Sequence, residues 1–165
     1  MTMPKSFKTI IAALALVILG VALYNWFAFV DQRQVRKTLC ELEERLSAPP
    51  GSGLDAALAG AALKPLFAPE VSVAVLRDGR EWRRDFGRDE LLRIILGAKQ
   101  GQPDLKVSLD FSLRDVKVAD GGTATVGVLV KVENFNEPIE PQRLTFTLGK
   151  ADDGRWRLVS VGVAA

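Results

Sequence analysis

The sequence predicts an α+β protein in which a single N-terminal transmembrane helix precedes a cone of three helices packed on a curved, mostly antiparallel sheet. Three observations carry this prediction. The chain begins with one long uncharged apolar run, continues with apolar residues at helical spacing, and ends in alternating strands joined by tight turns. Sequential strands joined by tight turns pair antiparallel, and helices must cover their apolar face.

The apolar run is expected to span a bilayer. A short basic tail, residues 1–8, precedes 22 residues without a charge, residues 9–30. At about 1.5 Å per residue, such a helix matches a hydrocarbon core of about 30 Å. Tyr24 and Trp26 lie near its C-terminal end, where aromatic rings favour the headgroup layer. Residues 9–30 are therefore predicted to contact the lipid bilayer as a single-pass signal anchor.

A cleaved signal peptide is the main alternative, and the flanking residues disfavour it. Its apolar region spans about 7–15 residues and ends in small residues, whereas this run is longer and ends in Trp-Phe-Ala-Phe-Val. Cys40, the only cysteine, follows Lys-Thr-Leu, which disfavours a lipoprotein cleavage site.

The orientation of the span is predicted from its basic tail. A short basic tail ahead of a first apolar segment stays in the cytoplasm. We therefore expect a cytoplasmic N-terminus, an inner-membrane span and a periplasmic C-terminal domain in a bacterial envelope. A simple count of basic residues does not favour this orientation, because the other flank holds Arg33, Arg36, Lys37 and Arg45.

Residues 31–165 are expected to form one domain, with its first helix at residues 31–47 and a linker of Pro, Gly and Ser at residues 48–53. One apolar stripe recurs along the helix at steps of four, three and four, namely Val35, Leu39, Leu42 and Leu46. The stripe either packs on the domain's own sheet or forms a coiled coil through which the protein self-associates. Two heptads are too few to favour the coiled coil.

The middle of the domain reads as a helix, a hairpin and a second helix. Residues 54–67 have helical spacing, and Pro65 is expected to kink or end that helix. Residues 71–76 alternate as a strand, and Asp78-Gly79 predicts a tight turn into a return strand ending at Phe86. A helix follows from residue 87, with acidic residues in its first turn.

The last third of the chain reads as strands with two irregularities. In residues 105–118 the apolar positions flip from odd to even numbers, which predicts a bulge or bend near Arg114-Asp115. Alternation resumes in residues 124–132 and 144–148. The final strand, which begins at Trp156, also changes phase, so it too must contain an irregularity.

Over about residues 33–163 the chain resembles the nuclear transport factor 2-like superfamily of SnoaL-like, cystatin-like α+β cones. The stretches that carry the resemblance are ALKPLFAPEVSV (62–73), GRDELLRIILGA (87–98) and the closing hairpins DGGTATVGVLVKV and RLTFTLGKADDGRWRLVSV. The resemblance implies a cone with an internal pocket. In its enzymes, such as ketosteroid isomerase, scytalone dehydratase and polyketide cyclases, that pocket holds Asp, His or Tyr.

This chain departs from the chemistry of those enzymes. It has no histidine, and its only tyrosine, Tyr24, lies in the anchor. Asp110 is expected to face solvent. Asp85, among several arginines, is either a general base or part of a solvated charge run, and the second interpretation is favoured. No catalytic, cofactor-binding or metal-binding residues are assigned, so we expect no enzyme and no cofactor.

The domain has no surplus charge. Lys5 and Lys8 are two of the 22 basic residues, and all 20 acidic residues follow position 30, so residues 31–165 are neutral overall. A neutral domain lacks the basic surface of a nucleic-acid binder.

These observations favour a membrane-anchored, non-enzymatic interaction or assembly module whose partner is another protein or a second copy. One alternative is a binder of a small apolar ligand, or a minor SnoaL-like enzyme, that uses the cone pocket. Its candidate lining residues are Phe86, Leu109, Phe111, Phe146 and Trp156. Another alternative is a self-associating structural subunit of a membrane complex, joined through the stripe.

Overall fold

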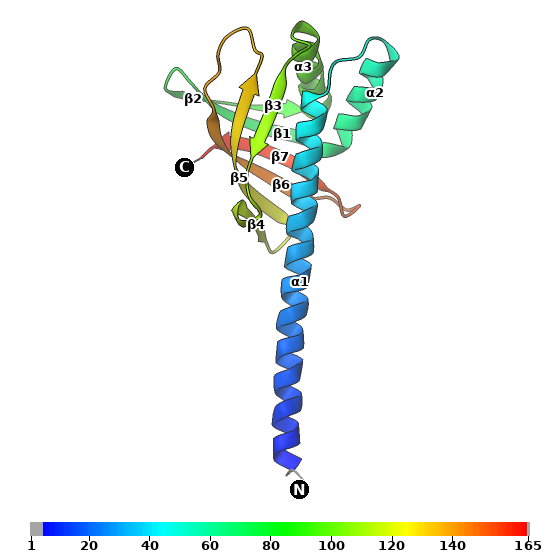
Figure 1. Ribbon diagram of the computed structural model, residues 1–165, viewed down its shortest axis with the longest axis vertical. Coiled ribbons are helices and arrows are strands. Elements are labelled where there is room, and N and C mark those ends of the chain that lie inside the picture. Colours follow the sequence, from blue (N-terminus) through cyan, green and yellow to red (C-terminus); the bar gives the residue numbers. More distant parts are fainter. Residues whose placement is uncertain (1–4, 165) are drawn as a thin grey trace.

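The computed structural model describes residues 5–164, which form one long helix joined to an α+β domain (Figure 1). The helices are α1 (Lys5–Ser47), α2 (Leu54–Leu63) and α3 (Arg88–Gly101), with two short 3-10 turns, η1 (Lys64–Leu66) and η2 (Leu113–Asp115). The strands are β1 (Phe67–Arg77), β2 (Arg80–Gly87), β3 (Lys106–Asp110), β4 (Val116–Ala119), β5 (Thr123–Glu133), β6 (Gln142–Lys150) and β7 (Trp156–Val163).

Helix α1 joins the predicted anchor and the predicted first domain helix without a break. It is 43 residues long, and between Gly20 and Pro49 it contains neither glycine nor proline, so nothing in this stretch interrupts it. Of the expected basic tail, residues 1–4 lie outside the described residues, and Lys5 already belongs to α1. The Pro-Pro-Gly segment after Ala48 then ends the helix, as the linker prediction expects.

The N-terminal part of α1 stands clear of the rest of the molecule (Figure 1). It is long and apolar enough to cross a membrane by length and composition, and none of its most apolar 18-residue window is buried. Side chains from Ile11 to Phe27 are all exposed, and burial begins around Val30 and Asp31.

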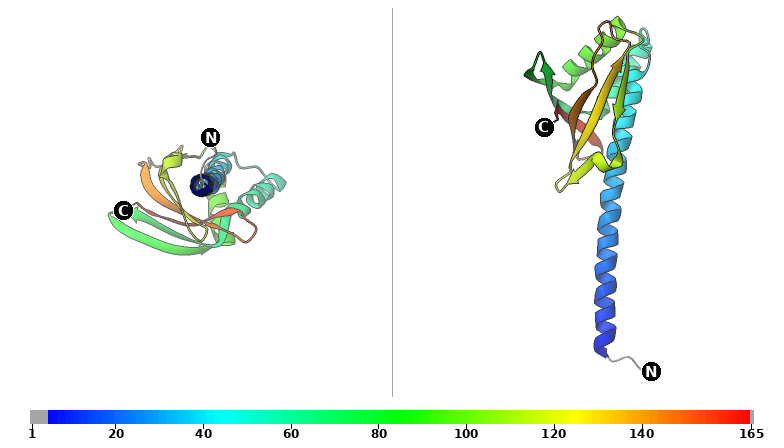
Figure 2. Two further views of the ribbon diagram at one scale, coloured as in Figure 1. Left: turned by 90° about the horizontal axis from the view of Figure 1, so that it is seen from below. Right: turned by 60° about the vertical axis from the view of Figure 1, so that its left-hand side comes forward.

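The seven strands form one curved sheet in the order β2-β1-β7-β6-β5-β3, and β4 also pairs with β5. Every pair is antiparallel except β1 with β7, which is parallel. The predicted α+β class and mostly antiparallel sheet are therefore confirmed. Viewed along α1, the sheet curves around the helix, which lies on its inner side (Figure 2).

The expected turns and irregularities fall where the pattern places them. Asp78 and Gly79 have φ of 51° and 74°, the left-handed conformation that a tight hairpin turn requires. Between β3 and β4 the chain leaves the sheet through η2, so the flip near Arg114-Asp115 separates two short strands. In β7 the pairing register with β6 shifts between Thr147 and Leu148, beside the exposed Val159.

The stripe on α1 packs against the sheet. Val35 and Leu39 are completely buried, Leu42 is 3% exposed, and Leu46 packs against the same core. The stripe therefore packs on the domain's own sheet, the first of the two expected arrangements, and self-association through it stays a prediction. Cys40 follows the buried Leu39 directly, so it lies about 100° around the helix from the stripe, and it is exposed.

Side chains of α1 also cover the free edge of β3. The Ser47 hydroxyl donates to the Val107 carbonyl oxygen at 2.8 Å and accepts from the Val107 amide at 3.0 Å. The Leu109 amide donates to Glu43 Oε2 at 3.0 Å. An edge strand exposes backbone N–H and C=O groups that have no partner strand. These contacts give hydrogen-bond partners to such groups of β3 and also attach α1 to the sheet.

Candidate functional site

The inner side of the cone holds a small apolar cavity of about 210 Å³. Helix α1, helix α3 and five strands surround it. Its lining residues are all apolar: Leu42, Leu46, Phe67, Val71, Val73, Leu91, Ile95, Val107, Leu109, Val130, Leu144, Phe146, Leu158 and Val161. The volume lies below the range of about 300–1,000 Å³ usual for small-molecule sites.

The cavity offers no group for acid–base or nucleophilic chemistry. Catalysis there needs a side chain that moves a proton, forms a bond or stabilises charge. None of the lining side chains bears a polar atom. Among residues 5–164, no cluster of three or more His, Cys, Asp or Glu residues is placed to hold a metal ion.

Of the five candidate pocket residues, two line the cavity and three do not. Leu109 and Phe146 line the cavity. Phe86 is buried near the end of β2 and does not line the cavity. The Arg84 guanidinium lies 4.8 Å from the centre of its ring, and the Trp82 ring centroid is 6.2 Å away.

Phe111 and Trp156 lie outside the cavity for different reasons. Phe111 follows the last residue of β3, where the chain leaves the sheet, and it borders a shallow polar hollow beside Asp115 and Arg143. Trp156 begins β7 and forms the floor of a separate groove beside α1. Alternation identifies the face of each strand, but it carries no information on where along that face the packing is incomplete.

The other lining residues are recognisable from the sequence as core positions but not as cavity positions. The pairs Leu42 and Leu46 on α1 and Leu91 and Ile95 on α3 each follow helical spacing. Only the crossing of α1 and α3 over the sheet brings these pairs to opposite sides of one space.

The candidate carboxylates point to solvent. Asp110 and Asp85 are exposed, and Asp85 pairs with Ser72 across the β1–β2 hairpin rather than facing the cavity. Neighbouring charges pair at the surface, within the hairpin as in Arg83–Glu81 at 3.1 Å, and from the hairpin to α3 as in Arg84–Glu90 at 2.7 Å. The hairpin thus has the character of a solvated charge run.

A second concavity, of about 560 Å³, lies between α1, the α2–η1 segment and the β6–β7 turn. We call it the α1–α2 groove. Its apolar side is formed by Ala62, Pro65, Leu66 and the buried Trp156. Its polar side is formed by Arg155 and by residues on one face of α1: Gln34, Lys37, Thr38, Glu41 and Arg45.

The charges of the groove are unequal. Glu41 accepts hydrogen bonds from Arg45 at 3.3 Å, so its charge is partly compensated. Lys37 and Arg155 form no ion pair with any residue between 5 and 164. The groove therefore presents two free cationic groups beside an apolar wall, a combination that suits an anionic ligand.

Comparison with solved structures gives many matches, although no family model and no curated protein matches the sequence. A protein from Kribbella flavida is similar with a TM-score of 0.62 and 11% identity, over 84% of this chain and 92% of that one. A candidate dehydratase of the NTF2-like family from Streptomyces avermitilis matches with a TM-score of 0.55 and 22% identity, over 82% and 98%. An NTF2-like protein of unknown function from Pseudomonas aeruginosa matches with a TM-score of 0.53 and 18% identity, over 79% and 93%. At these identities the likeness concerns the fold alone.

Proposed function

Since this chain carries an NTF2-like domain behind one long apolar helix, we propose that it is a membrane-anchored, non-enzymatic module that presents the domain at a bilayer surface. The main support is the continuity of α1. One helix supplies both the exposed apolar segment and the buried stripe of the domain, so the domain begins within about one turn of the end of that segment.

The apolar cavity supports the non-enzymatic part of the proposal. The enzymes that share this fold need polar groups in the cone, whereas here the lining is entirely apolar. The domain's contribution is then a shaped surface for a protein partner. The exposed Trp82 and Leu76 of the β1–β2 hairpin are candidate contact residues, because large exposed apolar side chains anchor interfaces.

Membrane fractionation tests the anchor. The full-length chain is expected to stay in the membrane pellet through an alkaline wash and to be released only by detergent, with its N-terminus intact. A variant with Leu16→Arg and Leu19→Arg should lose this behaviour, because two charges at the centre of the span are costly. Release of the unaltered chain by alkali, or a mature N-terminus after residue 30, would contradict the proposal.

Reporter fusions at each terminus test the orientation. We expect activity of a periplasmic reporter only at the C-terminus and of a cytoplasmic reporter only at the N-terminus. The opposite pattern would place the domain in the cytoplasm. It would contradict the proposed orientation but not the proposed membrane anchor.

The cavity favours a second function, the binding of a small apolar molecule. An enclosed cavity of about 150 Å³ lined by aliphatic and aromatic residues binds benzene, and this one is somewhat larger, entirely apolar and partly open. Benzene is expected to shift the methyl resonances of Val130 and Leu158. The change Ile95→Phe, which fills the space from α3, should remove the effect while the fold persists.

A further inference from the structure

Building on the proposed membrane anchor, we propose that the membrane-facing end of the domain binds the phosphate of anionic phospholipids. The site is a group of four cations, Arg33, Arg36 and Lys37 on α1 and Arg155 in the β6–β7 turn, which we call the juxtamembrane cations. Lys37 and Arg155 also form the charged side of the α1–α2 groove, near its membrane end at Gln34.

The height of these residues matches the headgroup layer. At about 1.5 Å per residue, Arg33 and Lys37 lie about 5 and 10 Å beyond Val30, where the apolar run ends. Helical side chains lean toward the helix N-terminus, which brings their charged ends back toward the bilayer. The headgroup layer extends about 5–8 Å beyond the hydrocarbon on each side.

The geometry around Arg33 supports an interfacial position. Its guanidinium lies 4.3 Å from the centre of the Phe29 ring, one turn nearer the N-terminus. Phe29 is the last aromatic residue of the apolar run and is 41% exposed. An aromatic ring in the hydrocarbon boundary with a cation above it is the arrangement of a side chain whose charged end reaches the headgroups.

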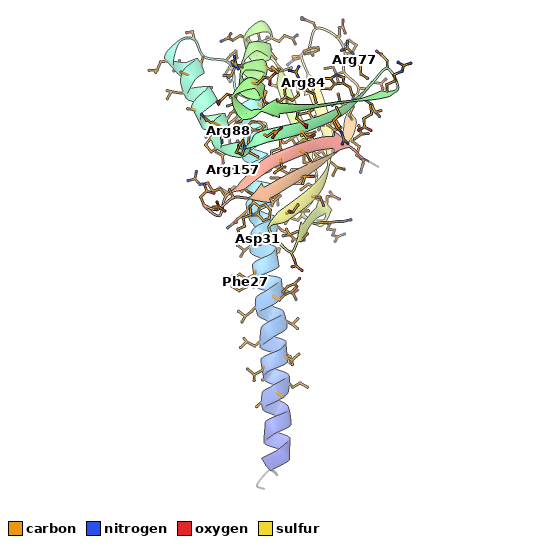
Figure 3. The ribbon with its side chains drawn as sticks, turned by 180° about the vertical axis from the view of Figure 1, so that it is seen from behind. Phe27, Asp31, Arg77, Arg84, Arg88 and Arg157 are labelled. Atoms are coloured by element: carbon orange, nitrogen blue, oxygen red, sulfur yellow. The ribbon has the colours of Figure 1, made fainter. Side chains whose placement is uncertain are left out.

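Pairing within the domain removes most of the negative charge near the site. Asp31 binds Lys150 at 3.0 Å, and Figure 3 shows Asp31 where α1 enters the domain. In the β6–β7 turn, Asp153 binds Arg157 at 2.8 Å.

The juxtamembrane cations themselves have no such partners. None of the four forms an ion pair with another residue in the described range. Two acidic residues of the turn lie near Arg155. Asp152 is exposed beside it, and Asp153, which binds Arg157, has a lowered pKa because it accepts from the Arg155 amide and lies near the Arg157 and Arg155 charges. The local surplus is therefore positive although residues 31–165 are neutral overall.

The β6–β7 turn holds Arg155 in place for this role. The Arg155 amide donates to Asp153 Oδ1 at 3.0 Å, and the Ala151 amide donates to the Arg155 carbonyl oxygen at 2.8 Å. Lys150, at the start of the turn, is fixed to α1 through Asp31. The turn and α1 thus place Arg155 and Lys37 in the lining of one groove, and we expect one phosphate to contact both.

The experiment uses full-length protein in nanodiscs of phosphatidylcholine mixed with phosphatidylglycerol, followed by native mass spectrometry of the retained lipids. We expect retained phosphatidylglycerol to exceed its share of the bilayer. The double variant Lys37→Gln and Arg155→Gln should lower this preference by about fivefold per removed charge, before screening by salt. Asp152→Asn should raise it.

Matched controls separate the possible outcomes. The variant Arg77→Gln and Arg93→Gln removes two exposed cations from the β1–β2 hairpin and α3 and should leave the preference unchanged. A chain that enters nanodiscs but shows no preference, or one equally sensitive to both double variants, overturns this inference and leaves the anchor standing. A chain that does not enter nanodiscs overturns both. Loss of the preference on adding millimolar inorganic phosphate would assign the site to free phosphate instead of a lipid.

Discussion

The two halves of helix α1 have the same backbone and opposite surroundings. Side chains from Ile11 to Phe27 are exposed on every face, whereas the half from Asp31 to Ser47 buries one apolar stripe and keeps its charged side chains exposed or partly exposed. The first half is apolar all round and the second is amphipathic, the patterns of a helix in lipid and of a helix on a sheet. A change of side-chain pattern along one continuous helix therefore changes what surrounds the helix, while its backbone continues without a break.

The largest expected effect comes from removing core volume in the second half. Leu39→Ala should lower the free energy of unfolding by about 2–5 kcal/mol, because Leu39 is fully buried and its removal leaves a cavity. Leu16→Ala in the first half is the matched control and should change domain unfolding by less than about 0.5 kcal/mol. Denaturant titration of the full chain in detergent measures both. Equal losses would mean that the two halves do not differ as described.

A smaller loss is expected from the contacts that fasten α1 to the edge of the sheet. Glu43→Ala leaves the Leu109 amide without its acceptor, which should cost about 1–3 kcal/mol. Hydrogen exchange at Leu109 should accelerate more than exchange at the central strand residue Val126. Glu44→Ala, at an exposed neighbour, should alter neither. If exchange at Leu109 is unchanged in Glu43→Ala, the edge does not depend on this side chain.

Separating the two halves of α1 should alter the position of the domain relative to the bilayer more than the stability of the domain. Inserting Gly-Ser-Gly-Ser between Val30 and Asp31 is expected to leave domain unfolding within about 1 kcal/mol, since long-range packing lies beyond the insertion. The exposed Cys40 accepts a fluorescent donor, and energy transfer to headgroup acceptors should show a broader distance distribution. The same insertion between Ser52 and Gly53 should leave that distribution narrow. A broad distribution already in the unaltered chain would show that α1 is not rigid.

The smallest expected effect is a pH dependence at the end of α1. Burial lowers the pKa of Lys99, whose Nζ donates to the Arg45 carbonyl oxygen at 2.7 Å. The unfolded state therefore binds the Lys99 proton more tightly than the folded state. As a result, the free energy of unfolding rises with pH between the lowered folded pKa and the ordinary lysine pKa near 10.4. Lys99→Met should flatten this part of the stability–pH curve. A variant curve parallel to that of the unaltered protein would contradict the assignment.

Much of the fold follows from local patterns because alternation records which side of a strand is buried. The phase flips near Arg114 and after Leu158 are sufficient to locate two irregularities along the chain. The parallel pairing of β1 with β7 does not follow in this way, because it joins segments about 90 residues apart and no local pattern encodes it.

The candidate site is less predictable than the fold. Leu109 and Phe146 belong to the cavity and Trp156 to the groove, yet all three have the same inward alternation. Which inward residue borders empty space depends on how α1, α2 and α3 cross the sheet. Nothing in the composition of its turn distinguishes Arg155, and only its position opposite Lys37 gives it a role.

The absence of a joint in α1 has a mechanical consequence. In a bilayer, a span tilts to match the thickness of the hydrocarbon around it. Glu43 and Ser47 bind the sheet edge directly, so the domain and α1 tilt together as one rigid body. A thinner or thicker membrane would then re-aim the outer surfaces of the domain without any change inside it.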